Sequence, residues 1–272
     1  MPDELQRLDL DGLEIAYRTV GEAHAPAVVL LHGWASSRRM WETAQHRLSA
    51  RFRTVALDLP GHGESSKPDW TWYSIPGYAD LVARLIERLD LRRPAAIGHS
   101  MGGTIALELA SRQPDALECL IAVNPVVTGR VYSRNIVFTD QWVEPAVRVS
   151  RRVWPAASRL LTRPPQALRR HTPDHIRRNS EDLGMTTADS ALGSMRAVLS
   201  WDLTERLSSI TARTLVIVGS HDRVVTAAEG EIAAQGVRGA RLVRLRAGHQ
   251  PYDEVPDDFY PMIEAFLAGA AF

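Results

Sequence analysis

An alternation of short apolar runs with longer amphipathic segments constrains the fold of this chain most strongly. Seven runs have the length and composition of strands: residues 13–20, 27–31, 54–59, 95–98, 119–124, 214–219 and 240–245. Helical patterns lie between or after them, at about residues 40–50, 77–90, 101–112, 226–235 and 255–268. Several runs are apolar at nearly every position, as in strands buried on both faces. The sequence therefore predicts an α/β fold with a mostly parallel central sheet flanked by helices.

One region interrupts this alternation. Residues 126–200 contain no strand pattern, only helical patches that we expect prolines to separate: Pro145, Pro155, Pro164, Pro165 and Pro173. One of these helices should begin at Pro173, with Thr172 as its N-cap. Because the strand rhythm resumes at Thr214, we expect a helical cap over residues 126–200, inserted into a core formed by residues 1–125 and 201–272.

Composition narrows the class of protein. The 272 residues are enough for one compact domain with an insertion. Basic and acidic side chains number 32 each, so no overall field attracts nucleic acid, and we expect a small-molecule substrate instead. The single cysteine, Cys119, excludes an internal disulfide. No apolar run is long enough to span a membrane, and the first residues lack a signal-peptide pattern, so we expect a cytoplasmic protein.

The stretch "AAIGHSMGGTIALELA" places Ser100 between Gly98 and Gly102, where an apolar run gives way to a helical pattern. A strand that passes directly into a helix makes a sharp turn, with the residue at its tip projecting outward and little room for side chains on either side. A Gly-x-Ser-x-Gly match alone arises by chance in about one chain in ten of this length. The prediction therefore depends on its position between a strand-like run and a helical pattern. Ser100 is the candidate nucleophile.

A serine hydroxyl needs a base to become nucleophilic. Of the nine histidines, His249 has the most informative position, in "AGHQPYDEVPDDF" after the last strand and before the last helix. The loops that follow parallel strands gather at one edge of the sheet, so His249 can meet Ser100 there. His99 directly precedes the serine, and we expect its ring to point the other way.

The base needs a partner that fixes its tautomer. Asp222, in "LVIVGSHDRVV", follows a strand and reaches the same edge. The order serine, aspartate, histidine along the chain suits this kind of sheet. A competing acid could follow the preceding strand, but that position holds Asn124. Asp222 is therefore the candidate acid.

Attack on a carbonyl creates an oxyanion that backbone N–H groups can stabilise. The N–H of Met101 is one candidate donor, because it starts the helix directly after Ser100. The second is the N–H of Trp34 in "HGWASS", after the run 27–31, where Gly33 gives the backbone room to turn.

Together these segments resemble the α/β-hydrolase superfamily, and in particular its small capped members, which include esterases, cofactor-free haloperoxidases and carbon–carbon bond hydrolases. The matching motifs are "LLHGW", "LDLPGHGES", "GHSMGG", "VGSHD" and "GHQPYDEVPDDF". The resemblance implies that Ser100 is the nucleophile, that His249 is the base oriented by Asp222, and that no cofactor is needed. Epoxide hydrolases and haloalkane dehalogenases carry aspartate where this chain has Ser100. Carbon–carbon bond hydrolases usually carry asparagine where it has His99.

Further residues are candidates for binding substrate or metal. Substrate contacts are expected from His32, His99, Trp142 and Trp154. The two tryptophans belong to the expected cap. With Val143, Val147 and Val153 they could form its inner apolar face over the serine, or its packing onto the core. His171 and His175 are spaced four apart in "HTPDH", but no third ligand accompanies them, so we expect no metal.

The sequence therefore predicts a serine hydrolase that cleaves a small to medium carboxylic ester through an acyl-enzyme. The same residues would also serve hydrolysis of a carbon–carbon bond in a diketone-like acid, perhydrolysis, lactone opening or thioester cleavage. A small-molecule receptor on the same fold is the alternative outside the enzymes. The natural substrate and the oligomeric state stay open at this point.

Overall fold

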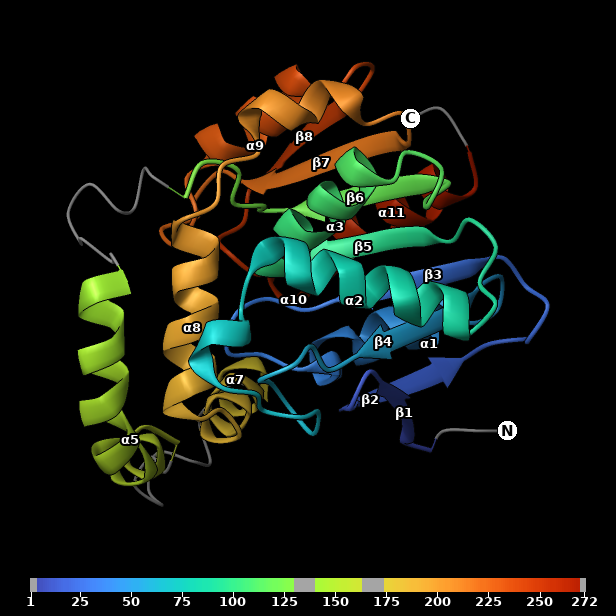
Figure 1. Cartoon of the computed structure of the whole chain (residues 1–272). Helices are drawn as coiled ribbons and strands as arrows, with labels where there is room; N and C mark the ends of the chain where they lie inside the picture. Colours follow the sequence, from blue (N-terminus) through green and yellow to red (C-terminus); the bar gives the residue numbers. More distant parts are fainter. Residues whose placement is uncertain (1–3, 130–139, 163–173, 270–272) are drawn as a thin grey trace.

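A computed structural model describes residues 4–129, 140–162 and 174–269 (Figure 1). Its centre is one eight-stranded sheet with the order β1-β2-β4-β3-β5-β6-β7-β8. The strands are β1 (Gln6–Leu10), β2 (Leu13–Val20), β3 (Ala27–Leu31), β4 (Arg53–Leu57), β5 (Ala95–His99), β6 (Cys119–Val123), β7 (Arg213–Gly219) and β8 (Arg241–Leu245). The pairs β1–β2 and β2–β4 are antiparallel, and every pair from β4 to β8 is parallel. The expected mostly parallel sheet is confirmed.

Strand β1 is the one strand in this sheet that the sequence pattern did not predict. Its residues QRLDL alternate between partly buried and exposed positions, and Leu10 alone is fully buried. It lies at the edge of the sheet, where it pairs Leu8 with Ile15. An edge strand covered on one face needs few apolar residues, so a search for continuous apolar runs passes over it.

Helices cover both faces of the sheet. They are α1 (Glu42–Leu48), α2 (Ile75–Arg88), α3 (Met101–Arg112), α9 (Ala227–Gly236), α10 (Pro251–Glu254) and α11 (Pro256–Leu267), with short 3-10 turns η1 (Arg38–Trp41), η2 (Trp70–Trp72) and η3 (Thr204–Ser209). Alternate residues of β3 divide between the two layers. Val29 and Leu31 pack in one apolar cluster with α2, α3 and α9, while Val28 and Leu30 pack in a second cluster with α1 and α11. Strands buried on both faces therefore account for the continuous apolar runs.

Three further helices gather at one end of the sheet: α5 (Asp140–Thr162), α7 (Asp174–Gly184) and α8 (Ala188–Leu199) (Figure 1). We call them the insertion helices. The expectation that Pro145 and Pro155 separate helical patches is wrong, because α5 continues through both. A proline removes one intrahelical hydrogen bond, a loss that packing can offset, and α5 packs on α7 and α8. Thr172 and Pro173 lie outside the described residues. Among the helices described, none combines the length and apolarity needed to cross a bilayer.

Candidate active site

Ser100 forms the turn between β5 and α3. Its backbone has φ 50° and ψ −117°, a conformation that non-glycine residues rarely adopt and that costs about 1–3 kcal/mol. A Cβ on Gly98 would lie 2.2 Å from the carbonyl oxygen of Gly102, and a Cβ on Gly102 would lie 2.3 Å from that of Leu31. Because both clashes involve backbone atoms, neither position accepts a side chain without moving the turn.

His249 and Asp222 are joined by a hydrogen bond. His249 lies in the loop between β8 and α10, and its Nδ1 is 2.7 Å from Oδ2 of Asp222, which follows β7. Asp222 Oδ1 accepts the backbone N–H groups of Val224 at 2.7 Å and Val225 at 2.9 Å. Since a carboxylate only accepts, His249 Nδ1 carries the proton and Nε2 keeps a free lone pair. A histidine that acts as a general base needs this tautomer.

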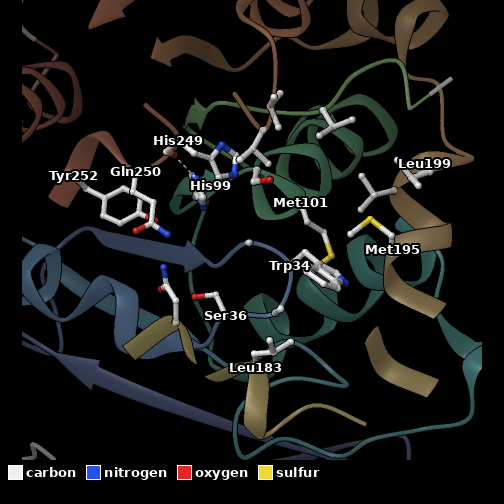
Figure 2. Close-up of a pocket in the computed structure, with 18 residues that line it drawn as sticks. Trp34, Ser36, His99, Met101, Leu183, Met195, Leu199, His249, Gln250 and Tyr252 are labelled. Atoms are coloured by element: carbon white, nitrogen blue, oxygen red, sulfur yellow. Dashed lines mark hydrogen bonds between the residues drawn. The ribbon is translucent and has the colours of Figure 1, made fainter. Parts of the chain in front are cut away.

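Ser100 and His249 line the same cavity of about 540 Å³ at the carboxyl edge of the sheet (Figure 2). Within the described part of the chain, the Ser100 hydroxyl makes no hydrogen bond to another side chain. Bonds between nucleophile and base are often long before substrate arrives and shorten in the reacting complex. The cavity wall also includes Gly33, Trp34, Ala35, Ser36, His99, Met101, Val126, Asn179, Leu183, Met195, Val198, Leu199, Val224, Val225, Gln250 and Tyr252.

The two candidate oxyanion donors border this cavity. Neither the Trp34 nor the Met101 backbone N–H donates to another backbone group in the described ranges. A Cβ on Gly33 would lie 3.4 Å from Ser100 Cβ, so the loop after β3 passes directly beside the serine. The Trp34 indole Nε1 donates to the carbonyl of Ala191 on α8 at 2.9 Å, which ties this loop to an insertion helix. Both N–H groups are thus placed beside Ser100.

His32 does not reach the cavity as a substrate contact. Its side chain is fully buried, and burial lowers its pKa to about 4. The N–H of Leu59 donates to His32 Nε2 at 2.9 Å, so Nδ1 must carry the proton that it shares with the carbonyl of Gly33 at 2.7 Å. Both ring nitrogens of His32 therefore have partners inside the protein. Its hydrogen bond to the carbonyl of Gly33 fixes the peptide between Gly33 and Trp34.

His99 differs from its expected orientation. Its ring lines the cavity with Ser100 and lies 4.5 Å from the ring of His249, centre to centre. Neighbouring residues of a strand point to opposite faces, but Ser100 has left the strand conformation, and the turn brings both side chains to one edge. His99 Nε2 is 2.8 Å from the carbonyl oxygen of His249. This places His99 among the candidate substrate contacts.

Asn124, directly after β6, is a site residue that no sequence motif marked. Its side-chain oxygen accepts the N–H of Gly219 at 2.8 Å, and its Nδ2 donates to the carbonyls of His249 at 3.0 Å and Gly248 at 3.3 Å. It therefore ties the end of β7 to the histidine loop. Its φ of 45° suits asparagine, which tolerates the left-handed region better than most residues.

Trp154 of α5 is not among the described residues that line the cavity. Trp154 donates its indole N–H to the carbonyl of Thr186 at 2.9 Å and lines a separate depression. Of the valines named with it, Val153 is 53% exposed, whereas Val147 is buried. Helix α5 packs on α7 and α8 (Figure 1). Those two helices contribute part of the cavity wall. The side chain of Trp142 lies outside the described residues.

Among the described residues, no three or more histidine, cysteine, aspartate or glutamate side chains are grouped as metal ligands would be. His175 belongs to α7, whereas His171 lies outside the described ranges.

Comparison with known proteins places this geometry in a family. Residues 26–256 match the family model described as alpha/beta hydrolase fold. A hydrolase from Pseudomonas aeruginosa PA01 superimposes with a TM-score of 0.82 at 30% identity, covering 97% of this chain and 98% of the other. The enol-lactonase from Burkholderia xenovorans LB400 gives 0.80 at 28%, covering 97% and 100%. The pimeloyl-[acyl-carrier protein] methyl ester esterase of Neisseria meningitidis is 31% identical over 89% of this chain and 93% of its own length.

Proposed function

Because this chain belongs to the α/β-hydrolase family, we propose that it is a serine hydrolase that cleaves small to medium carboxylic esters through an acyl-enzyme. The observation that carries the proposal is the hydrogen bond of 2.7 Å between His249 and Asp222, at the cavity that Ser100 also lines. Similarity to a methyl ester esterase and to an enol-lactonase supports the same class of reaction.

The proposed reaction follows from the positions of these groups. His249 Nε2 removes the proton of the Ser100 hydroxyl, whose oxygen attacks the carbonyl carbon of the ester. The N–H groups of Trp34 and Met101 donate hydrogen bonds to the carbonyl oxygen as negative charge develops on it. Each such donor typically contributes about 10²–10³ in rate. His249 then protonates the departing alcohol, and a water molecule repeats these steps to release the acid.

We further propose that residues 126–200 form a lid over a catalytic core of residues 1–125 and 201–272. The cavity wall supports this division, because α7 provides Asn179 and Leu183 while α8 provides Met195, Val198 and Leu199. The nucleophile, base and acid all come from the other part of the chain. Most of these lid residues are apolar, which suits an acyl chain of short to medium length.

Lactones are a second candidate class of substrate. The reasons are the similarity to an enol-lactonase over 97% of this chain and the chemistry, because a lactone is a cyclic ester that the same steps would open. The ring-opened hydroxy acid is then the only product. Simple lactones therefore belong in the substrate panel beside linear esters.

The test is turnover of a p-nitrophenyl ester series from acetate to dodecanoate by the wild type and by Ser100→Ala. We expect many turnovers per wild-type molecule, and a fall in kcat of at least about 10⁴-fold in the variant, with an unchanged circular dichroism spectrum. Release of one nitrophenol per molecule, without further turnover, would contradict the proposal and favour a receptor that retains the acyl group.

A further inference from the structure

Two polar side chains of the cavity wall make no hydrogen bond to the rest of the protein. Ser36 lies in the loop after β3, Gln250 directly follows His249, and both line the cavity. Neither the Ser36 hydroxyl nor the Gln250 amide has a partner in the described part of the chain. Both residues are half-buried, and their polar atoms are accessible, unlike Nδ1 of His99, which is enclosed. The two side chains can therefore bind a group that enters the cavity.

Both side chains lie on the side of the cavity that contains the candidate base. Figure 2 shows Ser36 and Gln250 on one side together with His249, whereas the sulfur atoms of Met101 and Met195 lie on the other. The polar and the apolar parts of the wall are thus separated. A ligand that matches this wall has a polar end and an apolar end.

The proposed mechanism assigns one part of the ester to each side. The imidazole of His249 protonates the departing alcohol, so the alkoxy oxygen must lie against this ring. The acyl carbon is bonded to Ser100 in the intermediate, and the acyl chain takes the remaining direction, away from His249. The alcohol part of the ester therefore extends toward Gln250 and Ser36, and the acyl chain toward the two methionines.

The polar side of the wall indicates which alcohols fit. Among the described residues that line the cavity there is no arginine, lysine, aspartate or glutamate. Nothing at the wall would balance a charge on the alcohol, so its polar group should be neutral. A serine hydroxyl and a carboxamide can each donate and accept a hydrogen bond, which matches the hydroxyl groups of an alcohol.

An alcohol part without polar groups would leave both side chains unpaired. Ser36 and Gln250 can bind water in the open cavity, and a bound ester displaces this water. An alkoxy group that offers no hydrogen bond in return therefore binds less well than one that does. The difference persists in the transition state for attack by Ser100, because the alcohol has not yet left.

We propose that the cavity selects monoesters of a short diol or triol with an apolar acid, and that the free hydroxyl groups bind the Ser36 hydroxyl and the Gln250 amide. The inference rests on the proposed ester hydrolysis and names the class of ester. The products are the acid and the polyol, and water is the only co-reactant. Its hydroxyl ends on the acid, and its remaining proton restores the Ser100 hydroxyl through His249.

The experiment compares three esters with the same acyl chain: 2,3-dihydroxypropyl, 2,3-dimethoxypropyl and propyl hexanoate. The wild type should have a kcat/KM for the dihydroxypropyl ester at least about tenfold above those for the other two, which cannot donate a hydrogen bond. Gln250→Leu and Ser36→Ala should each reduce this ratio about threefold, and the double variant should reduce it to near one. The backbone N–H of Gln250 bonds Glu254 whatever the side chain is, and each single variant serves if the double variant does not fold.

The matched control is Gln235→Leu, the same change at an exposed position of α9, which should keep the ratio of the wild type. Turnover of nitrophenyl esters without a preference for the dihydroxypropyl ester among the hexanoates would overturn this inference and leave the proposed function intact. A preference that survives the double variant, or both single variants, would also overturn it. No turnover of any hexanoate by the wild type, together with none in the nitrophenyl series, would instead overturn the proposed function.

Discussion

The edge of the sheet and the insertion helices are held in place by different kinds of contact. At the edge, the backbone packs so closely that neither Gly98 nor Gly102 has room for a Cβ, and the Asn124 side chain bonds three backbone groups. The insertion helices are attached to the core by side chains, such as Trp34 to Ala191 and Arg178 to Asp253. The region with the fixed backbone provides the proposed chemistry, and the region held by side chains contributes part of the cavity wall.

This difference predicts where substitutions change the rate and where they change the choice of substrate. Residues at the sheet edge should affect all substrates alike, because every ester needs the same proton transfers. Residues of α7 and α8 should affect substrates unequally, because each substrate meets the wall differently.

The largest effect is expected at the sheet edge, from Asp222→Asn. An amide can still accept from the N–H groups of Val224 and Val225 through its oxygen, so the loop keeps its bonds. Its NH₂ group would face His249 Nδ1 and favour the wrong tautomer. We expect kcat to fall by about 10⁴-fold for short and long esters alike. Steady-state kinetics on two chain lengths measure this, and a loss below tenfold would contradict the role of Asp222.

A smaller effect, on stability, is expected where an insertion helix meets the core. Asp182 of α7 is fully buried and burial raises its pKa to about 6, although a hydrogen bond from Ser37 and the charge of Arg39 lower it. Between pH 4 and 6 the folded state therefore keeps a proton that the unfolded state has released. Stability from this group is present at low pH and is lost as the pH rises through that window.

Asp182→Asn removes this dependence. The free energy of unfolding of the variant minus that of the wild type should increase by roughly 2 kcal/mol from pH 4 to pH 7, as measured by urea unfolding at both values. The control is Glu181→Gln, whose side chain is 48% exposed and pairs with Arg39 at 2.8 Å. That change should move the free energy of unfolding by less than about 1 kcal/mol. If both variants changed the pH dependence of the free energy of unfolding equally, the assignment of this dependence to Asp182 would be wrong.

The smallest effect is expected at the cavity wall, from Met195→Ala on α8. Removal of the thioether enlarges the apolar side, so the preferred acyl chain should lengthen by one or two carbons. The ratio of kcat/KM for decanoate over butyrate should rise about five- to tenfold, in line with the value of a buried methylene. An equal change in kcat/KM for all chain lengths would contradict this role, because Met195 would then affect all substrates alike, as residues of the sheet edge are expected to do.

The sequence was informative where local backbone rules decide the structure. Apolar runs located seven of the eight strands, and the loops after β5, β7 and β8 bring Ser100, Asp222 and His249 to one edge. Parallel strands impose this arrangement whatever the intervening residues are. The glycines on either side of Ser100 were interpreted by a similar local rule, because the tight turn leaves no room for side chains there.

Other features depend on packing between segments that are distant in sequence. No local pattern shows that Asn124 bonds the histidine loop, or that His32 is enclosed by Leu59 and Gly33. The wall residues on α7 and α8 also depend on how helices pack, and Trp154 of α5 lines a separate depression instead. Amphipathic patterns identify helices, but their partners follow from the whole fold.

Covalent labelling tests the central claim most directly, namely that Ser100 is the nucleophile activated by His249. The protein is treated with a fluorophosphonate, digested, and the labelled peptide identified by mass spectrometry, in the wild type, Ser100→Ala and His249→Ala. We expect one adduct, on the peptide that contains Ser100, absent from Ser100→Ala and formed at least about 100-fold more slowly in His249→Ala. An adduct on another serine, such as Ser36 in the same cavity, or an undiminished rate without His249, would contradict the account.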